Sequence, residues 1–503
     1  MLSIALSSLN SAAAIAVVLG LCLMFHETGH FVVAKLFRMK VDEFAFGFGP
    51  ALLSFRRGET LYRFNIFFFI GAYVKIAGME PGAEMEPRGF HSRPRWQGAL
   101  VIIAGSFFNI LLAILIFTIT TAWTGLPDPK DPSVYVGKTA TGSPAAKAGL
   151  LPGDKIVAVD GNRYSLKVTK VAPNSVAAKA GITTALEFDK VGKREVYTPK
   201  EMLVALREAK GPKVEVEALN YEARDFGDQY KMVQLPTLAA VPSPETKVGE
   251  NGVLPPTPSL KGGAKNGVLP PASSLKGGGE TAPEAELGKA LGVEFEPMHQ
   301  GSLVGYINLR PAKTVMLTIE RQGSERQVPV TTMVTNGRKM FRDDKGMLYS
   351  RIEPIGRIGA ILKGATRPAG ALESVKIGAL RTYGAVATVF ISTQAMVKKQ
   401  VAPELAGPVA IMAISVERSK VGWDAVLNWA GVISSILAIM NLFPFPPFDG
   451  FKALLIGIEA IMRRRVPAKL EIMISIVGFV VVVGLGLYLI FKDTLSLIFK
   501  GTV

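Results

Sequence analysis

The sequence predicts a polytopic α-helical membrane protein with about four transmembrane helices, a membrane-associated β-loop and extracytoplasmic α+β domains. Four charge-poor stretches carry this prediction, at roughly 4–30, 99–123, 425–448 and 472–491. Each approaches or exceeds the ~20 apolar residues that a membrane-spanning helix needs. Basic residues gather between the first two stretches and between the last two, so the positive-inside rule puts both loops in the cytoplasm. Both termini and the long central region are then expected outside.

The 503-residue chain is too long for one core, and its composition changes along the sequence. We expect an N-terminal membrane region (1–125, with the β-loop at about 42–78), an α+β domain with a degenerate second repeat (126–239), a disordered insertion (240–285), a second α+β portion (286–370) and a C-terminal membrane region (371–503). Disorder is predicted because a segment rich in Pro, Gly, Ser and Lys, from Asn251 to Gly263, recurs fifteen residues later. A weaker apolar segment at about 376–398 carries several basic residues, which favours an amphipathic helix that lies on the membrane surface or is partly inserted.

The outer region opens with a recognisable local pattern. Gly142 to Leu150 predicts a capped helical turn that ends at a glycine, and Gly153 to Gly161 predicts a turn, an alternating strand and a hairpin turn. This stretch resembles a bacterial PDZ domain. A second copy follows from Val168 to Ile182, but it lacks the Gly-Asp step after its helix, which suggests a degenerate repeat or an insertion. The resemblance implies that these PDZ-like domains bind peptide C-termini.

The most informative motif, His26-Glu27-Thr28-Gly29-His30, lies at the end of the first apolar stretch. Two histidines four residues apart lie on one face of a helix, so both can bind one Zn²⁺. Glu27 is placed to take a proton from a metal-bound water. The chain has only four histidines, and ionisable residues inside membrane helices are costly and therefore functional by default. The motif thus predicts a zinc site at membrane depth.

A third ligand is expected from another apolar setting, and Asp449 is the candidate. It lies near the end of Asn441-Leu442-Phe443-Pro444-Phe445-Pro446-Pro447-Phe448-Asp449-Gly450, which closes the third apolar stretch. The prolines unwind the helix, and a carboxylate at such a break can reach two histidines on another helix. Two histidines, one aspartate and one water would complete the open tetrahedron of a catalytic zinc.

Taken together, these motifs resemble the site-2 protease family of intramembrane metalloproteases, in the bacterial branch that carries PDZ domains. The HExxH motif in the first span and the Asn-x-x-Pro-x-Pro-x-x-Asp-Gly motif in a late span carry the resemblance. Shorter matches follow the family's order: Gly47–Pro50, Gly71–Lys75, Arg93–Trp96, Gly105–Asn109 and Gly407–Ile411. Phe451 stands where the family often has a second glycine, and Ser106 stands where proline is common. Neither departure touches an expected ligand.

The resemblance implies zinc held by His26, His30 and Asp449, with Glu27 as the catalytic base and acid. It also implies that Asn441 helps to hold the substrate backbone extended near the metal, and that the β-loop adds the unwound substrate as an extra strand. The implied reaction is regulated intramembrane proteolysis of a single-span membrane protein, an anti-sigma factor or a remnant signal peptide, after an outer-side cut. The implied location is the bacterial inner membrane, with the PDZ-like region on the extracytoplasmic side.

Two alternatives stay open at this point. A non-proteolytic membrane scaffold would use its PDZ-like domains to bind exposed C-termini, but it has no use for Glu27 as a general base. A sporulation-type protease acting on a membrane-bound pro-protein is disfavoured by the tandem outer region. Membrane lipid is an expected partner and nucleic acid is not, because the basic residues flank membrane spans. Cys22 is the single cysteine, so no intramolecular disulfide is expected.

Overall fold

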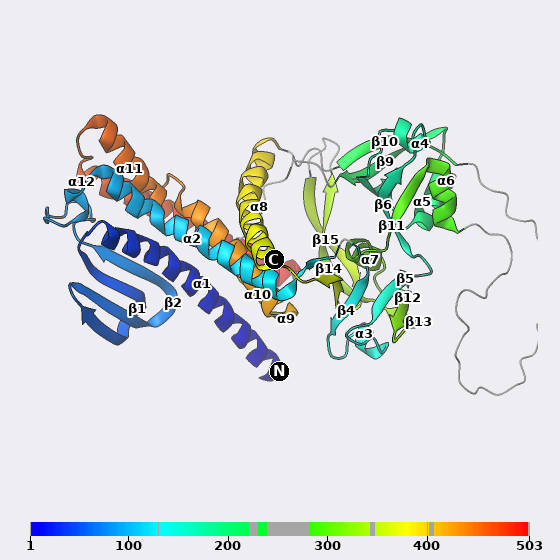
Figure 1. Cartoon of the computed structure of the whole chain (residues 1–503), viewed down its shortest axis with the longest axis horizontal. Coiled ribbons are helices and arrows are strands. Elements are labelled where there is room, and N and C mark those ends of the chain that lie inside the picture. Colours follow the sequence, from blue (N-terminus) through cyan, green and yellow to red (C-terminus); the bar gives the residue numbers. More distant parts are fainter. Residues whose placement is uncertain are drawn as a thin grey trace, which may run out of the picture. The chain divides into compact units, whose positions relative to one another are not determined.

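A computed structural model describes residues 2–128, 130–184, 186–220, 230–238, 282–342, 348–399, 401 and 407–500. Most of the predicted insertion, 240–281, lies outside the described residues. The chain divides into two compact units (Figure 1). The first comprises Met1–Pro127, Phe341–Tyr349 and Thr366–Val503, and the second comprises Asp128–Met340 and Ser350–Ala365.

The first unit is mainly helical. Its helices are α1 (Leu2–Leu36), α2 (Arg95–Thr124), α8 (Ala371–Val397), α9 (Pro408–Val421), α10 (Trp423–Asn441), α11 (Asp449–Met462) and α12 (Ala468–Lys500), with a short 3-10 helix at Phe90–Ser92. Among the described residues, three helices are long and apolar enough to cross a membrane: Arg95–Thr124, Trp423–Asn441 and Ala468–Leu495. They coincide with three of the four predicted stretches. The first stretch lies in the 35-residue helix α1, and the weaker segment forms α8.

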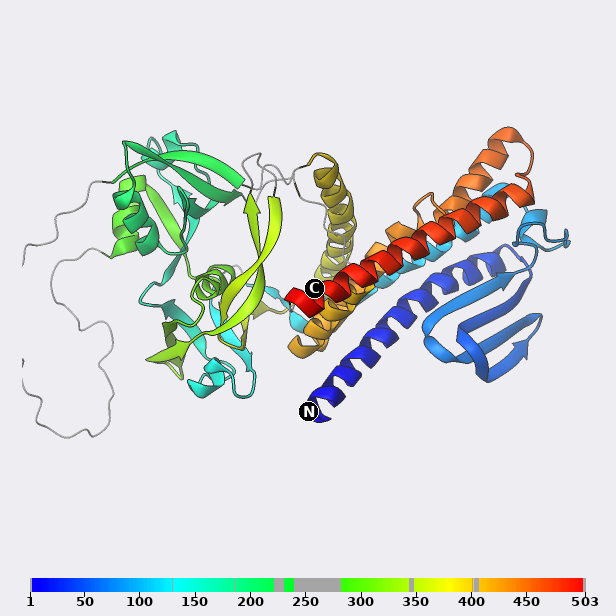
Figure 2. The same cartoon turned by 180° about the vertical axis from the view of Figure 1, so that it is seen from behind.

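Helix α2 is the centre of this unit, because it contacts α1, α8, α10 and α11. Glycines allow the helix axes to approach closely, as is common where helices pack without large side chains between them. Gly29 of α1 lies against the backbone of Ala104 in α2, and Gly431 of α10 lies against the ring of Phe117. Helix α12 runs along the bundle (Figure 2) and contacts α9, while most of its apolar surface is exposed. These close contacts around α2 fix the positions of the helices that carry the site described below.

The predicted β-loop is present as two long strands, β1 (Val41–Arg57) and β2 (Thr60–Ile76). Both strands bend back on themselves. Residues 43–46 pair with 72–75 on one side and with 61–64 on the other, while 51–57 pair with 60–65. The bend in β1 uses Gly47 and Gly49, whose φ angles of 85° and 88° favour glycine. The last part of β2, which precedes Ile76, therefore lies at an edge of the bent sheet.

The second unit contains two β-sheets, and each has five strands that are hydrogen-bonded one after another. One runs β13-β12-β5-β4-β16, and the other runs β10-β9-β7-β6-β11, with β8 paired to β7. The first path uses β4 (Val134–Thr139), β5 (Lys155–Val159), β12 (Thr314–Arg321), β13 (Ser324–Thr331) and β16 (Ala360–Gly364) with helices α3 (Pro144–Lys147) and α7 (Gln300–Asn308). The second uses β6 (Tyr164–Val171), β7 (Leu186–Val191), β8 (Arg194–Glu195), β9 (Lys213–Asn220), β10 (Tyr230–Pro236) and β11 (Val293–Pro297) with helices α4 (Val176–Lys179), α5 (Pro199–Glu208) and α6 (Pro283–Leu291). Strands β14 (Met333–Arg342) and β15 (Leu348–Arg357) form a two-stranded sheet. Strands β3 (Leu126–Pro127) and β17 (Thr366–Arg367) form another, which belongs to the first unit.

The second sheet is inserted into the first. The chain leaves the first sheet after β5, builds the whole second sheet from β6 to β11, and returns through α7 to β12. Two separate cores match this division: Leu287, Leu291 and Phe295 belong to the core of the second sheet, whereas Leu303 and Leu317 belong to that of the first. Residues 286–370, which we expected to form a second PDZ-like portion, are thus divided between the two sheets.

The two sheets repeat one local arrangement. Ser143 caps α3 by accepting the Ala146 N–H at 3.2 Å, and Ser175 caps α4 by accepting the Ala178 N–H at 3.1 Å. In each sheet, the glycine just before the last strand lies directly against the capping serine. Gly359, before β16, lies against Ser143, and Gly292, before β11, lies against Ser175. The repeat seen in the sequence is therefore also a repeat in three dimensions.

Candidate metal centre

His26 and His30 lie one turn apart on α1, and their rings meet. The two Nε2 atoms are 3.1 Å apart, and the histidines are 5% and 4% exposed. Because α1 continues through the motif without a break, the four-residue spacing places both rings on one face. This face points toward α2 and away from the exposed surface.

Asp449 reaches the same point from the start of α11. Its Oδ2 atom is 2.9 Å from Nε2 of His26 and 3.1 Å from Nε2 of His30. Two donors at about 2.0–2.1 Å from a tetrahedral zinc ion are about 3.3–3.4 Å apart, so the three atoms need only small shifts to bind one ion. Two imidazole nitrogens and one carboxylate oxygen also form a donor set that zinc prefers. These residues fit a zinc ion.

The tautomer of His30 supports this fit. Its Nδ1 atom lies 2.7 Å from the backbone carbonyl oxygen of Val101 in α2. Because a carbonyl oxygen can only accept a hydrogen bond, Nδ1 must carry the proton. The lone pair of His30 is then on Nε2, the atom that faces His26 and Asp449, as metal-binding histidines require.

The loop between α10 and α11 brings Asp449 back to the histidines. Helix α10 ends at Asn441, and the proline-containing turn leads to Phe448, the residue before α11. Gly450 packs so closely on the end of α10 that a Cβ there would come within 2.5 Å of the Phe443 carbonyl oxygen and closer still to Leu442. The predicted helix break is therefore a tight reversal, and it places the carboxylate across from α1.

Glu27 lies beside the two histidines and faces the edge of the bent sheet. The nearest donor atoms of His26, Glu27 and His30 all lie within 4.8 Å of one another. The Oε2 atom of Glu27 accepts the backbone N–H of Val74 in β2 at 3.1 Å. The carboxylate is thus held between the histidine pair and the final part of β2.

Asn441 completes the group. It is the last residue of α10, and its Nδ2 atom lies 3.4 Å from Nδ1 of His26. All five residues singled out from the sequence, His26, Glu27, His30, Asn441 and Asp449, therefore lie together, although more than 400 positions separate the first from the last. They come from α1, α10 and α11.

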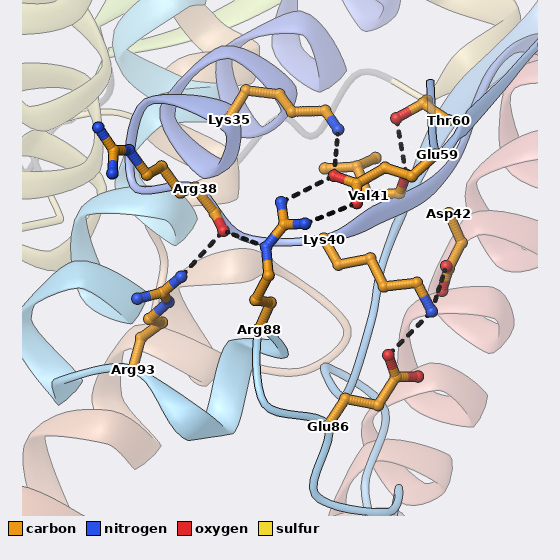
Figure 3. A network of polar contacts seen from close by, with 10 residues as sticks. All are labelled: Lys35, Arg38, Lys40, Val41, Asp42, Glu59, Thr60, Glu86, Arg88 and Arg93. Carbon is orange, nitrogen blue, oxygen red and sulfur yellow. Dashed lines mark hydrogen bonds and ion pairs between the residues drawn. The ribbon is translucent and has the colours of Figure 1, made fainter. Parts of the chain in front are cut away.

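Charged side chains hold the bent sheet against the end of α1 (Figure 3). Glu59, in the turn between β1 and β2, accepts hydrogen bonds from Lys35 at 3.0 Å and from both terminal nitrogens of Arg88 at 2.9 Å. The bond from Lys35 lowers the pKa of Glu59 below its usual value. Arg88 and Arg93 also donate to the carbonyl of Arg38, just after α1. This network fixes the position of β2 relative to Glu27.

Two features of the site could not be seen in the motifs. One is the Val101 carbonyl on His30, and the other is Gly105, whose Cα lies against the rings of both histidines. A Cβ at position 105 would come 2.6 Å from Cε1 of His26 and closer to Nε2 of His30. Gly105 opens one of the shorter matches to the family, Gly105–Asn109, but that match assigned it no role.

Three apolar helices, together with two buried histidines that lie beside a glutamate and an aspartate, are the features expected of a membrane metalloprotease. The model of Peptidase family M50 matches residues 14–485, and the chain belongs to this family, the site-2 proteases. It is 27% identical over 500 residues to a Thermotoga maritima protein named "Putative zinc metalloprotease", covering 94% of this chain and 96% of the relative. It is 26% identical over 499 residues to "Membrane metalloprotease ARASP, chloroplastic" of Arabidopsis thaliana, covering 98% and 81%. The protein is therefore a zinc metalloprotease of the membrane.

Proposed function

We propose that this protein is an intramembrane zinc endopeptidase that cuts a single-span membrane protein after an earlier cut on the outer side. The convergence of His26, His30 and Asp449 beside Glu27, on helices of a membrane protein, is the observation that carries the proposal. An anti-sigma factor or a remnant signal peptide is the expected type of substrate. About four transmembrane helices in a bacterial inner membrane, with the second unit on the extracytoplasmic side, complete the proposal.

In this proposal, His26 Nε2, His30 Nε2 and Asp449 Oδ2 hold the zinc ion. When bound, zinc supplies a Lewis acid that polarises the scissile carbonyl and lowers the pKa of water. Glu27 takes the proton from the attacking water as the new C–O bond forms. It then gives the proton to the amide nitrogen as the C–N bond breaks, so one water is consumed for each carboxyl and amine end formed.

Substrate geometry is the second requirement, because the peptide bonds of a helix are shielded by their own hydrogen bonds. The final part of β2 lies at a sheet edge next to Glu27, and an unwound segment could pair there as an added strand. Asn441, at the His26 side of the cluster, would hold the segment extended. The PDZ-like sheets of the second unit would restrict access to shortened substrates or bind their new C-termini.

Purified full-length protein and a single-span model substrate test the proposal. We expect wild type to contain one zinc ion and to cleave, Glu27→Gln to keep zinc without cleaving, and Asp449→Ala to lose zinc. His91→Ala is the matched control, since His91 lies outside the cluster and should keep both zinc and activity. Wild-type protein that binds no zinc would contradict the proposal.

The order of the two cuts has its own test. The same model substrate is prepared with and without a large folded domain on its outer side. Only the shortened substrate should be cleaved at an appreciable rate, and equal rates for both forms would remove the requirement for an earlier cut. Glu27→Gln again serves as the inactive control.

A further inference from the structure

Near the metal centre, helix α2 carries buried polar groups that have no hydrogen-bond partner among the described residues. The side chain of Asn109 is fully buried, and in the described part of the chain neither its Oδ1 nor its Nδ2 atom has a hydrogen-bond partner. The hydroxyl of Ser106, which is 1% exposed, likewise has no partner among the described residues. A carboxamide buried without partners costs on the order of 2–7 kcal/mol, so these three atoms need a ligand.

Two neighbouring hydroxyl groups have their single O–H donor engaged elsewhere, so neither donates to Oδ1 of Asn109. Ser434 of α10 donates to the backbone carbonyl of Asn109 at 2.8 Å. Ser435 donates to the carbonyl of Gly431, also at 2.8 Å. Both serines are fully buried. The side-chain amide of Asn109 and the hydroxyl of Ser106 therefore have no hydrogen-bond partner among the described residues.

The location of these groups points toward the histidines. Asn109 follows Gly105 by four residues, so it stands one turn further along the same face of α2. A helical side chain leans toward the N-terminal end of its helix, which directs the Asn109 amide toward the turn of Gly105. Gly105 has no side chain and lies against His26 and His30. Ser106 lies on the turn between them.

We propose that Ser106 and Asn109 bind water next to the metal centre and keep it there for the reaction. Buried waters typically make two to four hydrogen bonds to polar groups that would otherwise be unpaired. Peptide hydrolysis consumes one water per turnover, and bulk water does not reach the apolar interior of a bilayer. Ser106 and Asn109, on the side of α2 that faces the histidines, would bind the water molecule that is consumed in the next turnover. This inference rests on the proposed function, and it makes Ser106 and Asn109 positioning residues rather than catalytic ones.

The test compares Asn109→Leu and Ser106→Ala with wild type in the full-length, zinc-loaded protein. We expect kcat to fall about tenfold in Asn109→Leu, which corresponds to the loss of roughly one hydrogen bond, with KM and zinc content unchanged. Ser106→Thr, which keeps the hydroxyl, should retain more activity than Ser106→Ala. Ser435→Ala is the matched control, because that buried serine already bonds to Gly431.

A readout independent of activity is a structure of the wild-type protein at a resolution that shows ordered water. We expect water within hydrogen-bond distance of the Asn109 amide in wild type and none there in Asn109→Leu. Wild-type kcat in Asn109→Leu, loss of zinc from Asn109→Leu or Ser106→Ala, or an Asn109 amide without water in wild type would each overturn the inference. If one of these results is obtained while the wild-type protein still cleaves its substrate, only this inference has failed. Wild-type protein without zinc would instead contradict the proposed function itself.

Discussion

Gly105 of α2 lies directly against the ring of His30 in α1, with no room for a side chain between them. We therefore expect Gly105→Ala to displace the histidines, because the added methyl group would overlap Nε2 of His30 and come 2.6 Å from Cε1 of His26. Zinc affinity should fall about 10- to 100-fold, the usual effect of disturbing the groups that support metal ligands. Competition with a chelator of known affinity measures the change.

Gly384→Ala gives the matched control for this substitution. Gly384 lies within α8, and a Cβ added there meets nothing within 4 Å. Alanine in an open helical position should be neutral or slightly stabilising. Equal zinc affinity in Gly105→Ala and Gly384→Ala would show that α1 and α2 can separate without harm to the site.

Gly478 of α12 supports the loop that carries Asp449. A Cβ at this position would come 2.6 Å from the carbonyl oxygen of Pro446, three residues before Asp449, and would also overlap the proline ring. Gly478→Ala should push the loop and lower kcat/KM by about tenfold or more, since small misplacements of a reacting group are costly. Gly484→Ala, on the same helix but in open space, should behave as wild type in the same cleavage assay. A fall of equal size in both variants would assign the effect to α12 as a whole.

The convergence of His26, Glu27, His30 and Asp449 could be predicted because each one is conspicuous in its surroundings, whereas Asn441 was expected only from the family resemblance. Helix periodicity alone fixes His26 against His30, and a carboxylate at a proline break in an apolar segment needs a partner, which made Asp449 a candidate. The Val101 carbonyl could not be predicted, because every residue has a backbone carbonyl. Gly105 could not be assigned a role either, since a helical glycine looks the same in the sequence whether it contacts a ligand or faces open space.

The strand pairing by which one sheet is inserted into the other could not be predicted, for a different reason. The sequence shows two copies of a local motif, around Ser143 and around Ser175, and suggests that they follow one another. The edge strands β11 and β16, which complete the two sheets, pair antiparallel with β6 and β4 across more than 100 and 200 residues. Such pairing depends on packing in the finished core, which local periodicity does not encode.

Asp154, part of the Gly-Asp step that the second motif lacks, is expected to stabilise the first sheet. It is 2% exposed, accepts bonds from Arg321 at 2.6 and 2.7 Å, and accepts the Leu151 N–H at 2.8 Å. Asp154→Ala leaves these donors without their partner and should cost about 2–3 kcal/mol. Hydrogen exchange of the β5 and β12 amides in the full-length protein measures the loss.

Glu294→Ala is the comparison for Asp154→Ala, because the pair of Glu294 with Lys170 is exposed on both sides. An exposed ion pair typically contributes less than about 1 kcal/mol, so exchange of the β6 and β11 amides should change little. Equal losses of unfolding free energy in the two variants would mean that burial does not make the ion pair of Asp154 with Arg321 more stabilising than an exposed one.

Asp189 on β7 should make the second sheet less stable as the pH rises. Burial raises its pKa to about 6, assisted by the nearby carboxylates of Glu217, Glu195 and Glu187, and Lys190 offsets only part of the rise. Between about pH 4 and 6 the folded state therefore holds a proton that the unfolded state releases, so the free energy of unfolding falls with rising pH. Asp189→Asn should gain up to about 3 kcal/mol at pH 7 and nothing at pH 4.

Asp131 provides a control of opposite sign for this prediction. The hydroxyl of Ser133 lowers the pKa of Asp131, so its carboxylate stabilises the folded state above the unfolded pKa, and that contribution is lost as the pH falls. Asp131→Asn should therefore lower stability at pH 7, where Asp189→Asn raises it. Hydrogen exchange of the β7 and β9 amides, corrected for the intrinsic pH dependence of exchange, reports on Asp189, and the β4 amides report on Asp131. A gain from Asp189→Asn that is equal at pH 4 and pH 7 would show that the carboxyl group is not responsible, because only a titrating group changes its contribution across this range.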